Sequence, residues 1–296
     1  MIPFLGAGVN LCGRPADAAW EPGAFLPTGG ELASHLAGRF NYPQDEALDL
    51  ARVSEYACVV SGSGPLYEEL HDLFNADYPI TGLHQFLAGL PRRLAQANQP
   101  RRCQLIVTTN YDDALERAFR EAGEPFDLVC YLAEGEHRGK FAHWSPEGGP
   151  VLIEIPNQYS ELPPRENRER TVILKIHGAV DRSGPEAAEW DSFVITEDHY
   201  IDYLTRTELE NLVPVHLLKD LRRSNFLFLG YSMRDWNLRV ILHRIWRGQR
   251  LSYHPWAIQH RPDKLDCEFW EMRGVDVYDV PLEAYVPALE AALAEL

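Results

Sequence analysis

The chain has 296 residues, enough to bury a substantial core as one large domain or two small ones, and its 45% apolar and 24% charged residues are typical of a soluble globular protein. Its formal net charge of −16 argues against a general nucleic-acid-binding surface, because phosphate contacts need clustered Lys and Arg and no basic run exceeds two residues. A local basic patch, or nucleic acid held by a partner, stays open.

The five cysteines are too few and too scattered for a disulfide framework, and no two of them form a CxxC pair. The apolar start at residues 2–5 lacks a basic segment and breaks at Gly6, which argues against a signal peptide. No apolar run approaches the length of about 18 residues that a membrane-spanning helix needs. We therefore expect a protein of the reducing cytoplasm without a membrane span.

The first hundred residues combine one strand with several helices. Residues 2–5 predict a short strand, followed by a Gly-rich turn and a loop through residues 27–30. Because a helical block at about 31–97 separates this strand from the next, we expect the block to be an insertion over one face of a sheet. Its helices are expected at residues 31–39, 48–60, 64–75 and 82–97.

From residue 103 onward, predicted strands and helices alternate, although the pattern dissolves between residues 131 and 170. This alternation indicates an α/β fold, a Rossmann-like doubly wound parallel sheet in a single domain over residues 1–296. Strands or extended segments are expected at residues 103–107, 126–129, 140–143, 151–155, 171–175, 191–195, 225–229, 256–259 and 275–278. Helices are expected at residues 112–122, 196–204, 213–223, 235–246, 264–273 and 282–293.

Three short motifs each follow a predicted buried strand: Gly6-Ala7-Gly8, the segment at residues 108–112, and Lys175-Ile176-His177-Gly178. Loops at the carboxyl ends of parallel strands converge, so motifs far apart in sequence can meet in one crevice. This arrangement predicts a nucleotide site.

The glycine turn lets backbone N–H groups approach a pyrophosphate closely, although such turns occur in many folds. The third glycine of the dinucleotide fingerprint is absent, because Asn10 and its neighbours follow Gly8, and no acidic ribose anchor stands at the usual place. An ordinary dehydrogenase is therefore disfavoured. The segment from Gly230 to Ser232 predicts a second phosphate or ribose loop, or else a tight strand-to-helix turn.

Two of the motifs carry polar side chains with more than one interpretation. Asn110 or Asp112 could simply cap the helix that opens at this point. His177 could be a buried histidine bonded to a backbone carbonyl, which is the default for any one of eleven histidines. Alternatively, its imidazole could accept a proton from a ribose hydroxyl or a water as a general base.

In order and residue type, the motifs resemble the sirtuin family, in the compact branch that occurs in bacterial defence systems. The family's Gly-Ala-Gly turn matches Gly6, Ala7 and Gly8, and Asn10 stands where the family usually has a small hydroxyl residue. In the Thr-x-Asn-x-Asp motif, Tyr111 replaces the usual aliphatic residue. The other matching positions are Thr108, Asn110, Asp112, His177, Gly178, Gly230 and Ser232.

The resemblance implies a role for each matching side chain. Asn110 would contact the nicotinamide ribose of NAD and orient the nucleophile, and Asp112 would contact the carboxamide. His177 would be the catalytic histidine. Gly230 and Ser232 would contact the adenosine side of NAD.

The resemblance also implies a function: an NAD glycohydrolase that splits NAD into nicotinamide and ADP-ribose, depleting NAD in anti-phage defence. Protein-deacetylating sirtuins hold zinc with two CxxC pairs, which these cysteines cannot make, so we expect no metal. The implied control is a homo-oligomer or a partner, either a HerA-type ATPase or a short Argonaute.

Two other functions stay open. The pocket could sense NAD or an ADP-ribose derivative without turning it over. The chain could also be the nuclease subunit of a defence complex, which would need paired carboxylates around a divalent metal. Asp112-Asp113, Asp198 and Asp235 supply carboxylates without a recognisable spacing.

Overall fold

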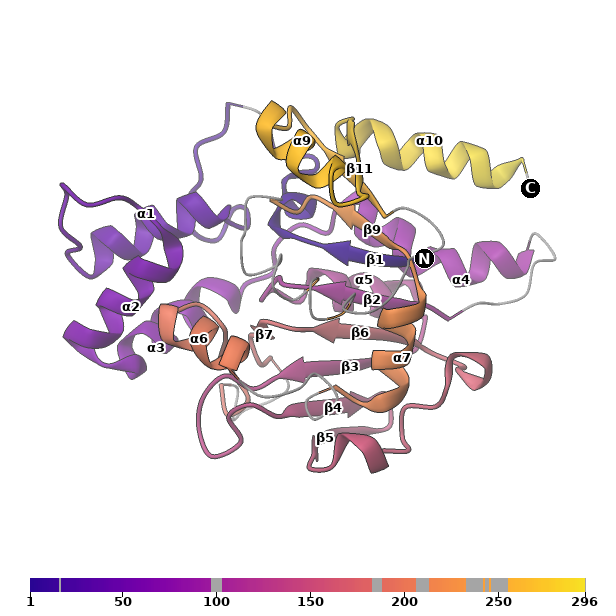
Figure 1. The fold of residues 1–296 in the computed structure, drawn as a ribbon, viewed down its shortest axis with the longest axis horizontal. Coiled ribbons are helices and arrows are strands. Elements are labelled where there is room, and N and C mark those ends of the chain that lie inside the picture. The colour runs from indigo at the N-terminus through magenta and orange to yellow at the C-terminus, as the bar shows by residue number, and fades with distance from the viewer. Residues whose placement is uncertain are drawn as a thin grey trace.

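The computed structural model of the protein describes residues 1–15, 17–96, 103–182, 188–205, 213–232, 242, 245 and 255–295. In this part of the chain, nine strands form one sheet in the order β11-β10-β9-β1-β2-β6-β3-β4-β5 (Figure 1). All neighbours from β11 to β3 pair in parallel. These parallel strands are β1 (Ile2–Leu5), β2 (Leu105–Thr108), β3 (Phe126–Tyr131), β6 (Thr171–Lys175), β9 (Phe226–Leu229), β10 (Trp256–Gln259) and β11 (Asp276–Asp279).

One edge of the sheet departs from the predicted parallel arrangement. β4 (Phe141–Ser145) pairs antiparallel with β3, and β5 (Gly148–Ile153) pairs antiparallel with β4. The physical reason is the length of the connections. Only residues 132–140 join β3 to β4, whereas a parallel crossover needs about a dozen residues or more.

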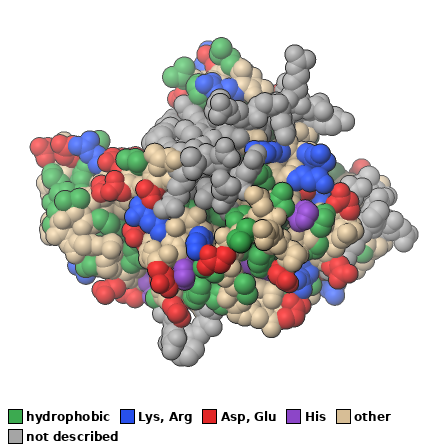
Figure 2. Space-filling view, turned by 60° about the horizontal axis from the view of Figure 1, so that its bottom comes forward, with side chains coloured by type: hydrophobic (Ala, Val, Ile, Leu, Met, Phe, Trp, Pro, Cys, Tyr) green, Lys and Arg blue, Asp and Glu red, His purple; other side chains and the backbone are tan. Residues whose placement is uncertain are grey.

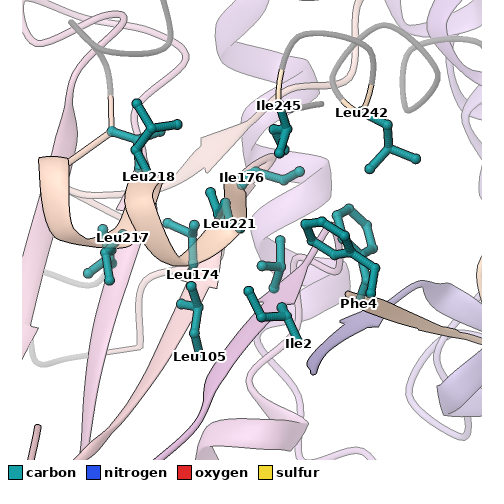
Figure 3. Packing of buried hydrophobic residues seen from close by; sticks show 14 of the residues in the cluster. Ile2, Phe4, Leu105, Leu174, Ile176, Leu217, Leu218, Leu221, Leu242 and Ile245 are labelled. Atoms are coloured by element: carbon teal, nitrogen blue, oxygen red, sulfur yellow. The ribbon is translucent and has the colours of Figure 1, made fainter. Parts of the chain in front are cut away.

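The inner parallel strands β1, β2, β6 and β9 are buried along their whole length because helices cover both faces of the sheet. On one face, Phe4 and Leu174 pack in the same core as Leu221 of α7 (Figure 3). On the other face, Ile106 and Ile173 pack with helices that lie behind the sheet in Figure 1. This confirms the doubly wound α/β fold. The covering helices are α7 (Val215–Arg223) and α9 (Lys264–Glu271) on the first face, and α4 (Gly82–Gln96), α5 (Ala114–Ala122) and α10 (Leu282–Ala294) on the second.

Most of the helical block lies elsewhere than expected. Only α4 covers a face of the sheet, whereas α1 (Gly29–Arg39), α2 (Leu50–Ser61) and α3 (Ser63–Phe74) lie beyond the carboxyl ends of the strands (Figure 1). Their apolar faces form a second core with one another, with Tyr111 in the loop after β2, and with Phe193 of the short strand at residues 192–193. An amphipathic pattern identifies the buried side of a helix but not the surface that buries it.

Shorter elements complete the described structure. Gly178–Ala179 and Ser192–Phe193 form a small antiparallel pair, β7 and β8. The sequence predicted the extended segment at residues 191–195, which contains β8, but not β7 or the pairing. Helix α6 (Glu197–Thr205) begins after Thr196, whose hydroxyl accepts the His199 N–H at 3.1 Å and so caps the helix. The turns of 3₁₀ helix are η1 (Ala7–Leu11), η2 (Pro156–Gln158) and η3 (Arg165–Asn167).

The helix predicted at residues 235–246 lies outside the described residues, apart from the buried side chains of Leu242 and Ile245. Within the described part of the chain, no helix has both the length and the apolar character needed to cross a membrane. On the face drawn in Figure 2, acidic and basic side chains are interspersed among apolar ones.

Candidate functional site

A cleft of about 730 Å³ lies at the carboxyl ends of the parallel strands. The loops that follow β1, β2, β6, β9 and β10 line it, together with residues of α1 and α6. Parallel strands end at the same edge of a sheet, so the topology itself gathers these loops. The cleft brings together nine of the predicted site residues: Gly6, Ala7, Gly8, Asn10, Asn110, Asp112, His177, Gly230 and Ser232.

Thr108 is the predicted residue that does not line the cleft. Its side chain is buried at the end of β2, where the hydroxyl accepts the Asn110 N–H at 3.1 Å and donates to the carbonyl of Leu5 at 3.3 Å. Thr108 therefore fixes the turn that presents Asn110.

The glycines of the first and last motifs pack directly against each other. The Gly8 N–H donates to the Gly230 carbonyl at 2.8 Å, and a Cβ on Gly8 would lie 2.6 Å from that oxygen. Gly230 has a φ of +59°, and a Cβ there would lie 2.4 Å from the Val9 nitrogen. Glycine is thus required at these positions because the two loops touch through their backbones. This requirement is separate from the close approach of a phosphate.

A short network of hydrogen bonds fixes the polar side chains after β2. The Asn110 amide donates to the Gly6 carbonyl at 3.2 Å. The Asn10 amide donates to one carboxylate oxygen of Asp112 at 2.9 Å, and the other oxygen accepts the Ala114 N–H at 3.0 Å. Asp112 thus stabilises the start of α5 and also faces the cleft, so the two interpretations of this residue are compatible.

His177 follows β6 and has an exposed fraction of 4%, although it lines the cleft. Its carbonyl accepts the Val194 N–H at 2.8 Å, and its ring lies edge-on to the ring of Tyr200, with 5.6 Å between the centroids. Gly178 has a φ of +86°, and a Cβ there would lie 2.0 Å from the Ser192 oxygen. Only glycine lets the chain turn from His177 into the β7–β8 pair.

Some lining residues were not predicted from the sequence. Tyr200 comes from α6, Thr28 precedes α1, Gln259 ends β10, and residues 260–263 follow this strand. The last group had a signal, because residues 256–259 were predicted as a strand and the carboxyl end of a parallel strand belongs at this edge. Neither Tyr200 nor Thr28 follows a strand of the sheet, and no sequence motif marks them.

The charged side chains around the cleft are mostly acidic. Among the lining residues that the structure describes, Arg261 carries a positive charge. Asp263 and Asp266, which follow it closely in the chain, carry negative charges, as does Glu283 elsewhere in the cleft wall. Burial raises the pKa of the Cys12 thiol in the cleft wall to about 12, so this side chain stays uncharged at neutral pH. Within the described ranges, no group of three or more His, Cys, Asp or Glu side chains could hold a metal ion.

Comparison with known proteins agrees with this geometry. The family profile described as the SIR2-like domain matches residues 104–278, more than half of the chain. The chain belongs to the SIR2-like family. The match begins just before β2 and ends within β11, so it includes the Asn110 and His177 loops and lies after the glycine turn of β1.

Several curated proteins are similar to this SIR2-like chain. An NAD(+) hydrolase ThsA from Enterococcus faecium is 27% identical over 244 residues, which cover 82% of this chain and 39% of the relative. Another ThsA, from Acinetobacter baumannii (strain 532279), is 28% identical over 251 residues, with coverage of 82% and 38%. Defense-associated sirtuin 2 from Bacillus subtilis is 23% identical over 295 residues, with coverage of 94% and 23%. The matched region is thus well under half of the length of each of these relatives.

The contact between the two glycine loops leads to a prediction about stability. We expect Gly8→Ala to lower the free energy of unfolding by about 1–3 kcal/mol, the usual cost of forcing extra atoms into a packed site. Gly38→Ala is the matched control, because a Cβ at this exposed position of α1 meets no atom within 4 Å. There we expect a gain of about 0.5–1 kcal/mol. Urea unfolding measures both changes, and equal stability of Gly8→Ala and the parent would contradict the close contact.

Proposed function

We propose that this chain is an NAD glycohydrolase that cleaves NAD to nicotinamide and ADP-ribose. The observation that carries the proposal is the single cleft in which Asn110, Asp112 and His177 meet the glycine loops of β1 and β9. Its volume of about 730 Å³ lies in the range usual for small-molecule sites. Three similar proteins that carry the name NAD(+) hydrolase ThsA support the choice of substrate, at 23–28% identity.

The proposed reaction breaks the bond between the ribose C1′ and the nicotinamide ring nitrogen. The bonding electrons leave with nicotinamide and neutralise its ring nitrogen, and the ribose passes through an oxocarbenium-like state. A water oxygen then adds to C1′ while its proton passes to a base. The chain holds the two fragments and the water in line. The attack of water then proceeds from a fixed position and not from a random bimolecular encounter.

Each side chain has a proposed role in this step. Asn110 orients the ribose and the water, and its fixed contact with the Gly6 carbonyl keeps the amide in place. Asp112 contacts the carboxamide, in an orientation set by Asn10. His177 takes the proton of the water or of a ribose hydroxyl. The backbone around Gly6, Ala7 and Gly8 and around Gly230 and Ser232 holds the pyrophosphate and adenosine parts.

We further propose that the enzyme acts in the cytoplasm and depletes NAD during anti-phage defence. One similar protein bears the name defense-associated sirtuin, which supports this setting. Uncontrolled hydrolysis would harm the cell that makes the enzyme, so its activity must depend on assembly. The proposed assembly is a homo-oligomer that works with a partner, of the HerA-type ATPase or short Argonaute kind.

His177→Ala should abolish nicotinamide release from NAD, because removal of the imidazole removes the proposed proton acceptor. The measurement is a chromatographic assay of nicotinamide, with the melting temperature recorded in parallel. His143→Gln is the control: this histidine is also buried, and it bonds to Asp127 and Tyr159 away from the cleft. Activity in a folded His177→Ala variant equal to that of the parent would exclude the general-base role.

Asn110→Ala should lower kcat by about 100-fold or more, the scale of losing a group that acts in the transition state. NAD should still bind in part, since the pyrophosphate loops belong to other strands. Steady-state kinetics and calorimetric titration with NAD separate the two effects. A sharp fall in melting temperature together with complete loss of binding would instead assign Asn110 a structural role.

The assembly proposal predicts a mass above that of a monomer in light scattering of the purified chain. Two neighbouring apolar side chains of α2, Val59 and Val60, have exposed fractions of 76% and 59%, which supports the helical block as the proposed contact surface. We expect V59E/V60E to lower the measured mass, whereas Leu265→Glu on α9, at a side chain that is also exposed, should not. A fully active monomer at micromolar concentration would contradict the proposal.

A further inference from the structure

A buried ion pair lies between the last residue of β6 and the first turns of α5. The Lys175 ammonium donates to a carboxylate oxygen of Glu116 at 2.7 Å, and the exposed fractions of the two side chains are only 1% and 3%. Lys175 stands two residues before His177, and Glu116 stands four residues after Asp112. The pair therefore lies beside both loops that carry the proposed catalytic side chains.

Filling this space with an ion pair costs free energy. Burial of two charges removes them from water, and apolar side chains of similar volume often give equal or greater stability. The second carboxylate oxygen of Glu116 has no hydrogen-bond partner among the described residues, so the desolvation is not fully offset. Burial raises the pKa of Glu116 despite the opposing effect of Lys175. Burial alone would lower the pKa of Lys175, but Glu116 and Asp112 raise it above its ordinary value.

The ammonium makes another contact that explains what the pair does. Lys175 also donates to the main-chain carbonyl of Asp112. The side chain of Asp112 accepts the amide of Asn10, and Asn110 donates to the carbonyl of Gly6. One buried cation thus links β6, α5 and the β2 loop, and through Asp112 it reaches the loop after β1.

We propose that Lys175 and Glu116 are positioning residues that hold the loop of Asn110 and Asp112 in register with His177. Glu116 keeps the ammonium charged and directed at the Asp112 carbonyl, and Lys175 fixes the loop to the strand that ends at His177. Neither side chain lines the cleft. The kinetic part of this inference rests on the proposed function, whereas the structural part does not.

The test replaces the whole pair, because removal of one partner would leave a buried charge unpaired. The double variant Lys175→Met/Glu116→Leu should fold with a melting temperature close to that of the parent. Its kcat for nicotinamide release should fall at least about tenfold, with little change in KM, since displaced reacting groups lower the rate of the chemical step. Amide hydrogen exchange in residues 109–114 should become faster.

A second buried pair provides a matched control. Arg168 and Asp220 approach to 2.9 Å with exposed fractions of 1% and 11%, and Arg168 precedes β6, at the end of this strand opposite to His177. Arg168→Met/Asp220→Leu should leave both kcat and the exchange of residues 109–114 at parental values. If Lys175→Met/Glu116→Leu also keeps parental kcat and exchange, the pair is merely structural and the inference is wrong.

A second double variant and a readout that does not depend on activity complete the test. If the apolar double variant does not fold, Lys175→Gln/Glu116→Gln, which removes both charges and keeps a polar side chain at each position, replaces it with the same expected results. Unchanged exchange and kcat in that variant would overturn the inference equally. If the parent chain releases no nicotinamide, the proposed function fails, and hydrogen exchange alone then decides whether Lys175 and Glu116 hold the loop.

Discussion

The backbone contact between the loops after β1 and β9 is the constraint on which the cleft depends. These strands are neighbours in the sheet, and Gly8 and Gly230 let their loops touch without intervening side chains. The Gly6 carbonyl in the first loop then accepts the amide of Asn110 from the β2 loop. The position of Asn110 is thus built on a contact between two other loops, and a bulkier residue at Gly8 or Gly230 would move it.

The sequence predicted the parts of the fold that depend on local pattern. Apolar runs bounded by glycine or polar residues marked the parallel strands, and the doubly wound arrangement followed from their alternation with helices. The direction of β4 was not predicted, and the location predicted for α1–α3 was wrong. Both depend on which surface an element meets in space, and periodicity contains no information about that.

The candidate site shows the same division. The motifs after β1, β2, β6 and β9 could be recognised because each follows a strand end, where topology places loops in one crevice. Lys175 lies in the motif at residues 175–178, but its role was not predicted, since its partner Glu116 is 59 residues away and on a helix. Tyr200 was also missed, because its place opposite His177 depends on how α6 packs at the edge of the sheet.

Tyr111 joins the cleft to the helices beyond the strands. It stands between Asn110 and Asp112, and its ring packs edge-on against Phe74 of α3 and against Phe193. Its hydroxyl donates to the Val194 carbonyl at 2.8 Å, and the N–H of Val194 in turn donates to the carbonyl of His177. An aliphatic side chain at this position could fill the core but could not make that bond.

The loop that presents Asn110 is therefore held from two sides. On the side of the sheet, Lys175 of β6 donates to the backbone of this loop, and on the other side Tyr111 anchors the loop in the core of α1–α3. Packed side chains transmit displacement because a core has little free volume to absorb it. A shift of α1–α3 relative to the sheet must then be taken up at Tyr111, one residue from Asn110. A contact on the outer surface of these helices that shifts them would therefore also displace the loop of Asn110, even where the contact is far from the cleft in sequence.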